Sequence, residues 1–138
     1  MITSVAVTVL NAQADTMARH LDDGWLDFYD GERPETANHP LDIQEYILGL
    51  QFNSPSAPSA ENGIIRATFK GPGTAVRSGV ISWARVYMAD HRTKILDCSV
   101  GLAGSDANII MERTQIPAGA QRVMDFWEHR LAGETRGM

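Results

Sequence analysis

Residues 78–88 read SGVISWARVYM, and this stretch decides the expected fold. In an extended chain, successive side chains point to opposite faces. One face then carries Val80, Ser82, Ala84, Val86 and Met88, and the other carries Ile81, Trp83, Arg85 and Tyr87. Both faces are largely apolar, so we expect a central β-strand that is covered on both sides.

Shorter strands are expected on both sides of this segment. Residues 94–100 (KILDCSV) follow a turn at residues 90–92, which predicts an antiparallel hairpin with the central strand. Further strands are expected at residues 25–30, 44–52, 64–70 and 108–111 and around Ile116, whereas residues 122–130 fit either a strand or a helix. The residues expected to form structural turns are Asp30, Gly31, Pro34, Gly101, Gly104 and Asp106.

The N-terminal part of the chain has the periodicity of a helix. Apolar residues recur at helical spacing at Leu10, Ala14, Met17 and Leu21. Gly24 lies where a helix would end, and Asn11 is a candidate N-cap. We expect a helix at residues 10–23 and leave residues 1–8 open between helix and strand.

Together these elements predict a mainly β fold, an antiparallel β-sandwich or jelly-roll-like domain with a short N-terminal helix. The 138 residues are the usual size of a single domain. We expect an N-terminal arm at residues 1–9, the helix at 10–23, the β-sandwich at 24–130 and a flexible tail at 131–138.

Charge and composition argue against two classes of partner. The chain has 17 acidic and 12 Lys or Arg residues, and the basic ones are scattered, so no cluster is expected to bind nucleic-acid phosphates. The same balance argues against an anionic membrane surface, and no apolar run approaches the roughly 20 residues of a membrane-spanning helix. The opening MITSVAVTVL lacks the basic start of a signal peptide, which predicts a chain that stays in the cytosol where it is made.

No residue pattern predicts an active site, a cofactor or a metal centre. The four histidines, which include no pair at metal-binding spacing, are His20, His39, His91 and His129. Cys98 is the single cysteine, and its neighbour Asp97 would point to the opposite face of a strand. We therefore expect no enzymatic activity and a buried Cys98, with a disulfide between two copies as the alternative.

Large aromatic side chains and one charge within a strand are the remaining candidates. Trp25, Tyr29, Trp83, Tyr87 and Trp127 are expected to fill a core or a subunit interface. Arg85 lies within an apolar strand, and we expect it either to form a buried charge pair with Asp97 on the neighbouring strand or to reach an interface. Exposed Trp25 or Trp83 would instead indicate a carbohydrate-binding module.

Several short motifs occur in an order that resembles a known family. They are YDGERP at residues 29–34, SG at 78–79 with WAR at 83–85, DCSVG at 97–101, GSDAN at 104–108 and IPAG at 116–119. This ordered set, which spans about residues 10–130, resembles small structural proteins encoded in tailed-bacteriophage and prophage gene clusters, usually described as hypothetical phage proteins. The chain departs from that pattern at Cys98, where glycine is usual, and in its charged C-terminal segment.

The resemblance implies a structural protein of the virion, assembled in the cytoplasm of the host bacterium. Within the virion we expect a minor capsid protein that decorates or cements the head by binding the major capsid protein or other virion proteins. A homo-oligomer is expected, with a trimer as the implied form, and neither nucleic acid nor membrane is an expected partner. The alternatives are a tail, baseplate or head–tail connector protein and, in another class, the carbohydrate-binding module.

Overall fold

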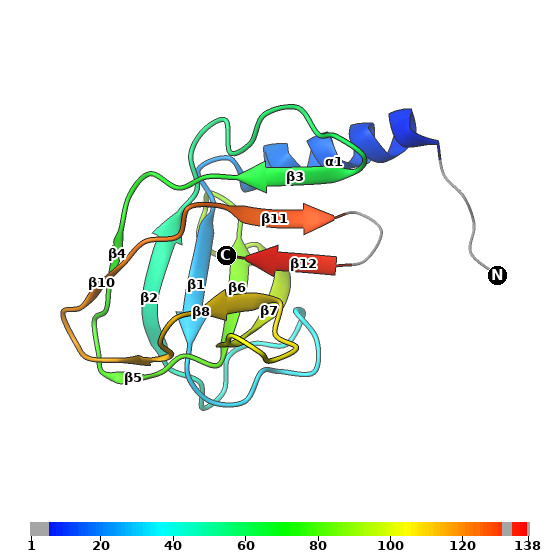
Figure 1. Cartoon of the computed structure of the whole chain (residues 1–138). Helices are drawn as coiled ribbons and strands as arrows, with labels where there is room; N and C mark the ends of the chain where they lie inside the picture. The colour runs from blue at the N-terminus through cyan, green and yellow to red at the C-terminus, as the bar shows by residue number, and fades with distance from the viewer. Residues whose placement is uncertain (1–5, 131–133, 138) are drawn as a thin grey trace.

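The computed structural model describes residues 6–130 and 134–137, which form one helix and a mainly β body (Figure 1). This confirms the predicted fold class. The elements are α1 (Val7–Leu21), β1 (Trp25–Tyr29), β2 (Tyr46–Gln51), β3 (Ile64–Ala67), β4 (Gly73–Thr74), β5 (Gly79–Val80), β6 (Trp83–Tyr87), β7 (Lys94–Leu102), β8 (Ile109–Met111), β9 (Gln115–Ile116), β10 (Gln121–Arg122), β11 (Trp127–Arg130) and β12 (Glu134–Gly137).

The main sheet within the described residues has eight strands, in the order β2-β1-β6-β7-β8-β12-β11-β3. Its two edge strands approach each other, because Phe52 after β2 forms an antiparallel bridge with Phe69 after β3. Beside this bridge, the Asn53 N–H donates to the Thr68 carbonyl at 2.9 Å. The sheet therefore curls into a sandwich-like body, and the small pairs β4–β10 and β5–β9 complete one end of it.

The hydrophobic core lies on the inner face of the curled sheet. Leu26 and Phe28 of β1 and Ala84 and Val86 of β6 are at most 1% exposed. All five residues of β6 are buried, and the strand lies between β1 and β7, antiparallel to both. The expected two-sided burial of the central strand and its hairpin with residues 94–100 are therefore confirmed.

Helix α1 packs along β3 and is tied to the loop at residues 53–63. Its buried residues are Ala14, Ala18 and Leu21. The helix begins at Val7, three residues before the expected start, and includes part of the expected N-terminal arm. The expected cap at Asn11 is wrong, because Asn11 lies inside the helix and its Oδ1 accepts a hydrogen bond from Gly63 N–H at 2.8 Å.

The expected single strand at residues 78–88 is interrupted in the structure. Gly79 and Val80 pair with β9, and the Ile81 N–H still donates to the Thr114 carbonyl at 2.8 Å. The Ser82 N–H then donates to the Tyr29 carbonyl at 3.0 Å. The chain changes its pairing partner between Ile81 and Ser82, which the alternation of side chains does not reveal.

Two other expectations are wrong at the end of the sheet. The tail expected at residues 131–138 contains β12, which pairs antiparallel with β11 and, through Gly137 and Ile109, parallel with β8; residues 131–133 and 138 lie outside the described part. The sheet is also not wholly antiparallel, since β7 and β8 run parallel. Backbone pairing forms β12, so the polar sequence ETRG gave no signal for it.

We expect Gly24→Ala to destabilise the fold strongly. Gly24 joins α1 to β1, and an added Cβ would lie 2.5 Å from the Tyr87 carbonyl oxygen and 2.8 Å from that of Leu21. Backbone atoms cannot move aside cheaply, so a loss of about 2 kcal/mol or more is expected in urea denaturation. Gly71→Ala is the control, because a Cβ there meets nothing within 4 Å. Equal effects of the two substitutions would contradict the tight junction.

Candidate functional site

The outer face of the main sheet carries a row of charged residues across three neighbouring strands. In the strand register, Asp27 of β1 lies opposite Arg85 of β6, and Arg85 lies opposite Asp97 of β7. The loop at residues 30–45 and the turn at residues 88–93 supply further contacts to this row. This row is the first candidate site, because a buried charge is costly unless an opposite charge and hydrogen bonds compensate it.

Arg85 forms the ion pair with Asp97 that the sequence offered as one of two alternatives. The guanidinium donates from Nε to Asp97 Oδ1 at 2.7 Å and from its NH2 group to Oδ2 at 3.1 Å, and it has no exposed surface. A third donor reaches the His39 carbonyl at 2.8 Å. Burial lowers the pKa of Arg85, but the hydrogen bonds and charge of Asp97 raise it above its ordinary value. Arg85 therefore attaches the loop at residues 30–45 to the sheet.

Aromatic side chains surround this row. Tyr29, Trp83 and Tyr87 are buried on the outer face, and Trp25 and Tyr46 pack against them. Tyr29 stacks on Trp83 with ring centroids 4.7 Å apart, and the two hydroxyls of Tyr29 and Tyr87 are hydrogen-bonded at 2.9 Å.

Trp127, the fifth aromatic candidate, is buried in the main core instead of this cluster. It has no exposed surface, and its ring packs edge-to-face on Phe52 with centroids 5.7 Å apart. Four of the five candidates, Trp127 included, are thus buried, and the fifth, Trp25, is half-buried.

Asp27 forms the second charged contact of the row, with His91 in the turn after β6. Its Oδ2 lies 2.6 Å from His91 Nε2, and the His91 ring stacks on Trp25 with centroids 4.5 Å apart. The other carboxylate oxygen of Asp27 is buried without a hydrogen-bond partner among the described residues. Gly49 lies opposite, and a Cβ there would be 2.5 Å from that oxygen, so the glycine leaves room for the carboxylate.

Burial makes Asp27 a weaker acid than an ordinary aspartate. It raises the pKa of Asp27 from 3.8 to about 6, although the hydrogen bond and charge of His91 oppose the shift. Burial and the charge of Asp27 also raise the pKa of Tyr46 to about 12. The pKa of Tyr29 is raised by burial and by its hydrogen bond to Tyr87. Asp27 can therefore gain or lose a proton in mildly acidic solution.

The expected turn residues close the loop at residues 30–45. Asp30 does not start a local turn through its side chain; its Oδ1 accepts from the Glu45 N–H at 2.8 Å, and its own N–H donates to the Glu45 carbonyl at 3.1 Å. Gly31 follows with a φ of 78°, a conformation that favours glycine. Pro34 lies within the loop, outside any strand.

The second group of expected turn residues lies between β7 and β8. Gly104 has a φ of 92°, and Asp106 is exposed after it. Gly101 is not a turn residue, because β7 continues to Leu102. A Cβ at Gly101 would lie 2.5 Å from Ser105 Oγ, so the glycine lets the turn fold back on the strand.

The chemistry available to the remaining candidates is limited. Cys98 is buried, and burial raises the pKa of its thiol to about 12, which disfavours the reactive thiolate. Within residues 6–130 and 134–137, no three His, Cys, Asp or Glu side chains gather as a metal site requires. No helix in this described part is long and apolar enough to cross a membrane.

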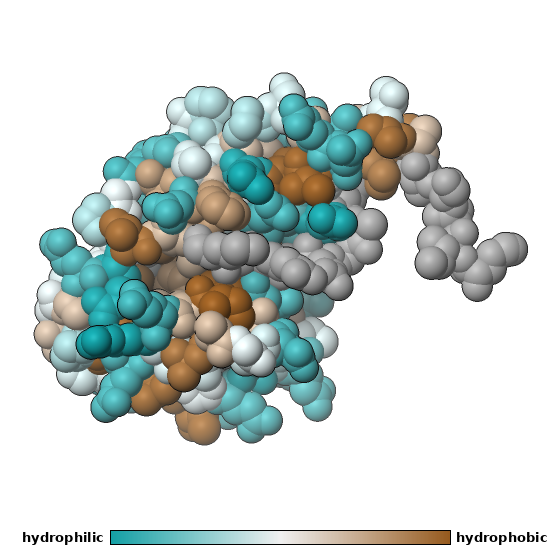
Figure 2. Space-filling view, viewed as in Figure 1, coloured by the Kyte–Doolittle hydropathy of each residue, from teal (hydrophilic) through white to brown (hydrophobic). Residues whose placement is uncertain are grey.

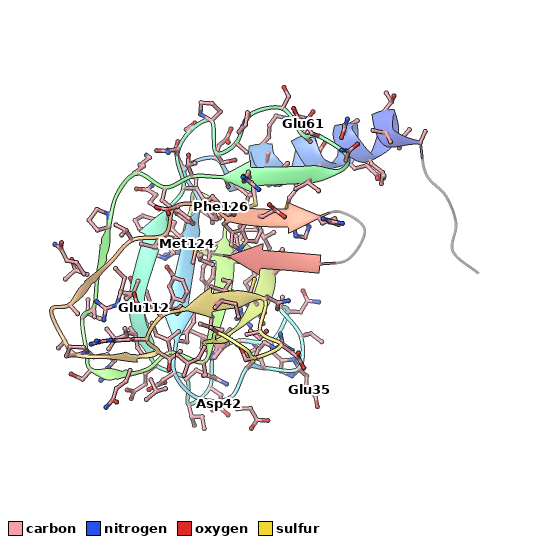
Figure 3. The ribbon with its side chains drawn as sticks, in the orientation of Figure 1. Glu35, Asp42, Glu61, Glu112, Met124 and Phe126 are labelled. Carbon is pink, nitrogen blue, oxygen red and sulfur yellow. The ribbon has the colours of Figure 1, made fainter. Side chains whose placement is uncertain are left out.

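A second candidate site consists of two grooves with apolar linings. The β8–β10 groove, of about 490 Å³, is lined by Phe28, Leu48, Leu50, Gln121, Arg122, Val123 and Met124 and by residues 110–113. The β5–β9 groove, of about 860 Å³, is lined by Ser78, Gly79, Val80 and Leu102 and by residues 112–117. Glu112 and Arg113 belong to both, so the two grooves adjoin; Figure 3 labels Glu112 and Met124.

Large apolar side chains stand exposed among the residues that line these grooves. Val123 is 72% exposed in the first groove, and Val80 and Leu102 are 52% and 50% exposed in the second. Figure 2 shows apolar surface on the lower half of the viewed face, where Figure 1 places β8 and β5. A surface of this kind is typical of contact with another protein.

Comparison with known proteins finds no relative of this chain. No protein-family model, curated protein or solved structure matches the chain.

Sequence reasoning assigned no role to Asp27 or His91, and it did not single out the grooves. Asp27 could have been found, because it is a lone charge between Trp25 and Tyr29 on one face of a strand, just as Arg85 is a lone charge in β6. His91 gave no signal, since its contact with Asp27 joins residues 64 positions apart.

We expect Asp97→Asn to cost about 3–5 kcal/mol of stability, because it leaves the Arg85 charge buried without its counter-charge. The double variant Arg85→Met with Asp97→Leu removes both charges and is expected to cost less. Glu128→Gln is the control, since it removes an ion pair with Arg66, whose side chain is 62% exposed, and should cost less than about 1 kcal/mol. Chemical denaturation measures all three. A loss in Asp97→Asn as small as in Glu128→Gln would refute a structural role for the buried pair.

We expect Asp27→Asn to stabilise the protein at neutral pH by at most about 3 kcal/mol. The pKa of Asp27 is raised by folding, so its protonated form favours the folded state. This contribution is complete below about pH 4 and is lost as the pH rises through about 6. Urea denaturation from pH 4 to 8 should therefore show a smaller fall in stability for Asp27→Asn than for the unaltered chain. Asp42→Asn, at an exposed site, is the control; identical pH profiles of Asp27→Asn and the unaltered chain would exclude a buried, titrating Asp27.

Proposed function

We propose that this chain is a structural subunit of a tailed-bacteriophage virion and that it acts as a minor capsid protein that decorates or cements the head. The observation that carries the proposal is the apolar surface of the two adjoining grooves. Val80, Leu102 and Val123 are at least half exposed there, and they are three of the eight large apolar side chains that stand exposed among the described residues. Burial of such side chains against a neighbouring protein is favourable, at roughly 25 cal/mol per Å².

The ordered motifs that resemble phage proteins support the same proposal. YDGERP begins the loop at residues 30–45, and WAR provides Trp83 and Arg85 of the central strand. These residues make the contacts that hold the loop on the sheet. The motifs thus coincide with contacts on which the outer face depends.

The mechanism follows from surface burial. Each copy would bridge neighbouring molecules of the major capsid protein, and separation of the subunits would then require re-exposure of the apolar surface. A specific interface buries roughly 1,200–2,000 Å² in total. Many such contacts on one particle would make expansion of the head under internal DNA pressure harder.

The same surface also suits a subunit of the tail, the baseplate or the head–tail connector. Copy number separates these locations, since a decoration protein follows the number of capsid subunits and a tail protein follows the rotational symmetry of the tail. The structure does not favour a carbohydrate-binding module. Trp83 has no exposed surface, and His91 covers one face of Trp25.

Mass spectrometry of purified particles tests the proposal in a phage that encodes this chain. We expect the protein in the virion in proportion to the major capsid protein. Val123→Asp should reduce its incorporation at least tenfold, because a charge in the β8–β10 groove opposes burial. Val76→Asp is the matched control, at a valine that is 68% exposed and lines neither groove. Absence of the unaltered protein from purified particles would reject the virion role.

A further inference from the structure

The turn that leads into β3 contains the dipeptide Asn62–Gly63, the single Asn-Gly pair in the sequence. Glu61 and Ile64 flank this pair and are joined by two backbone hydrogen bonds, of 3.1 and 2.9 Å, as in a tight hairpin. Asn62 has a φ of 54° and Gly63 a φ of 74°, which match the two central positions of a type I′ turn. Figure 3 labels Glu61 in this turn, beside α1.

An Asn-Gly pair has a reactive chemistry of its own. Once it has lost its proton, the Gly63 backbone nitrogen can attack Asn62 Cγ. The new N–Cγ bond closes a succinimide ring, and the side-chain amide nitrogen takes up a proton and leaves as ammonia. Water then opens the ring at one of its two carbonyls, which gives either aspartate or isoaspartate. Glycine favours the ring closure because it has no Cβ to hinder the approach, and asparagine is accordingly a thermolabile residue.

Helix α1 holds the nitrogen that would attack. Asn11 Oδ1 accepts a hydrogen bond from the Gly63 N–H at 2.8 Å, and Gly63 is buried although Asn62 is exposed. A Cβ at Gly63 would lie 3.2 Å from Leu10 Cβ, so the turn and the helix are in close contact. A buried N–H in a hydrogen bond is a poor nucleophile, because a base must first remove its proton. The helix therefore protects the reactive pair at its nucleophile.

We propose that Asn62 is a site of deamidation and that α1, through Asn11, controls the rate of the reaction. While the helix is docked on the turn, the Gly63 nitrogen is protected. Local opening, which is most frequent near the ends of a structure, releases that nitrogen and lets the ring close. The proposal is independent of the virion role, since it uses no residue of the two grooves.

Deamidation would in turn loosen the contact between the turn and α1. Isoaspartate adds one carbon atom to the main chain inside a two-residue turn, which then no longer fits the two hydrogen bonds between Glu61 and Ile64. Just before the turn, the Ala60 N–H donates to Asp15 Oδ1 at 2.7 Å, so this tie to the helix is strained as well. The second half of the helix keeps its ties to Ser56. The reaction thus acts as a one-way switch that releases the first half of α1.

Ageing of the purified full-length chain at mildly alkaline pH tests the protection. Peptide mass spectrometry measures the conversion of the Asn62 amide to an acid, and an isoaspartate methyltransferase assay identifies the isomer. We expect Asn11→Ala to accelerate the conversion about fivefold, the effect of one lost hydrogen bond, while alanine preserves the helix. Asn11→Asp is the matched control, because it keeps the accepting oxygen, and it should react no faster than the unaltered chain.

The rate at Asn53 serves as an internal reference in the same samples. Asn53 is followed by Ser54 and has no contact with Asn11, so its rate should be equal in all three chains. A parallel rise at Asn53 in Asn11→Ala would assign the effect to general unfolding and overturn the proposal. Equal rates at Asn62 in Asn11→Ala and the unaltered chain would overturn it too.

Hydrogen exchange tests the release of the helix. In the fraction that carries isoaspartate at position 62, we expect the amides of residues 11–15 to exchange at least tenfold faster than in fresh protein. The amides of β6, in the middle of the sheet, should exchange at the same rate in both. Unchanged exchange of residues 11–15 after the reaction would reject the switch.

Discussion

The guanidinium group of Arg85 has no exposed surface, and its burial constrains the whole outer face of the sheet. A buried charge requires a counter-charge and hydrogen-bond partners, since its desolvation costs several kcal/mol. Asp97 provides two hydrogen bonds and the His39 carbonyl provides a third. The last contact holds the loop at residues 30–45 on the sheet, and that loop also accepts a hydrogen bond from the Trp83 indole through the Asp30 carbonyl.

The environment of Asp27 is a second consequence of the buried Arg85–Asp97 pair. It lies opposite Arg85 in the strand register, but the guanidinium is already committed to Asp97, and Asp27 pairs with His91 instead. One of its oxygens remains without a partner among the described residues, and its pKa rises to about 6. The outer face is thus filled with polar and aromatic contacts of the chain itself. Large exposed apolar side chains lie instead at the two grooves and on the loop at residues 30–45.

Much of the sheet could be predicted because burial imposes a period of two on a strand. The alternation at residues 78–88 predicted a strand that is covered on both sides, and the expected hairpin placed Asp97 on the strand next to Arg85. The predictions failed where a contact depends on backbone pairing alone. β12 and the parallel pairing of β7 with β8 are examples, as is the exchange of partner between Ile81 and Ser82.

By itself, the sequence determined a mainly β chain with an N-terminal helix, a central strand buried on both faces and a charged residue within that strand. Local alternation and turn chemistry carry that information. Only the tertiary structure decided that Asp27 meets His91, that five aromatic residues form one cluster and that Val80 and Leu102 share a groove. These are contacts between residues far apart in the chain, and they depend on how the sheet curls, which no short stretch of sequence encodes.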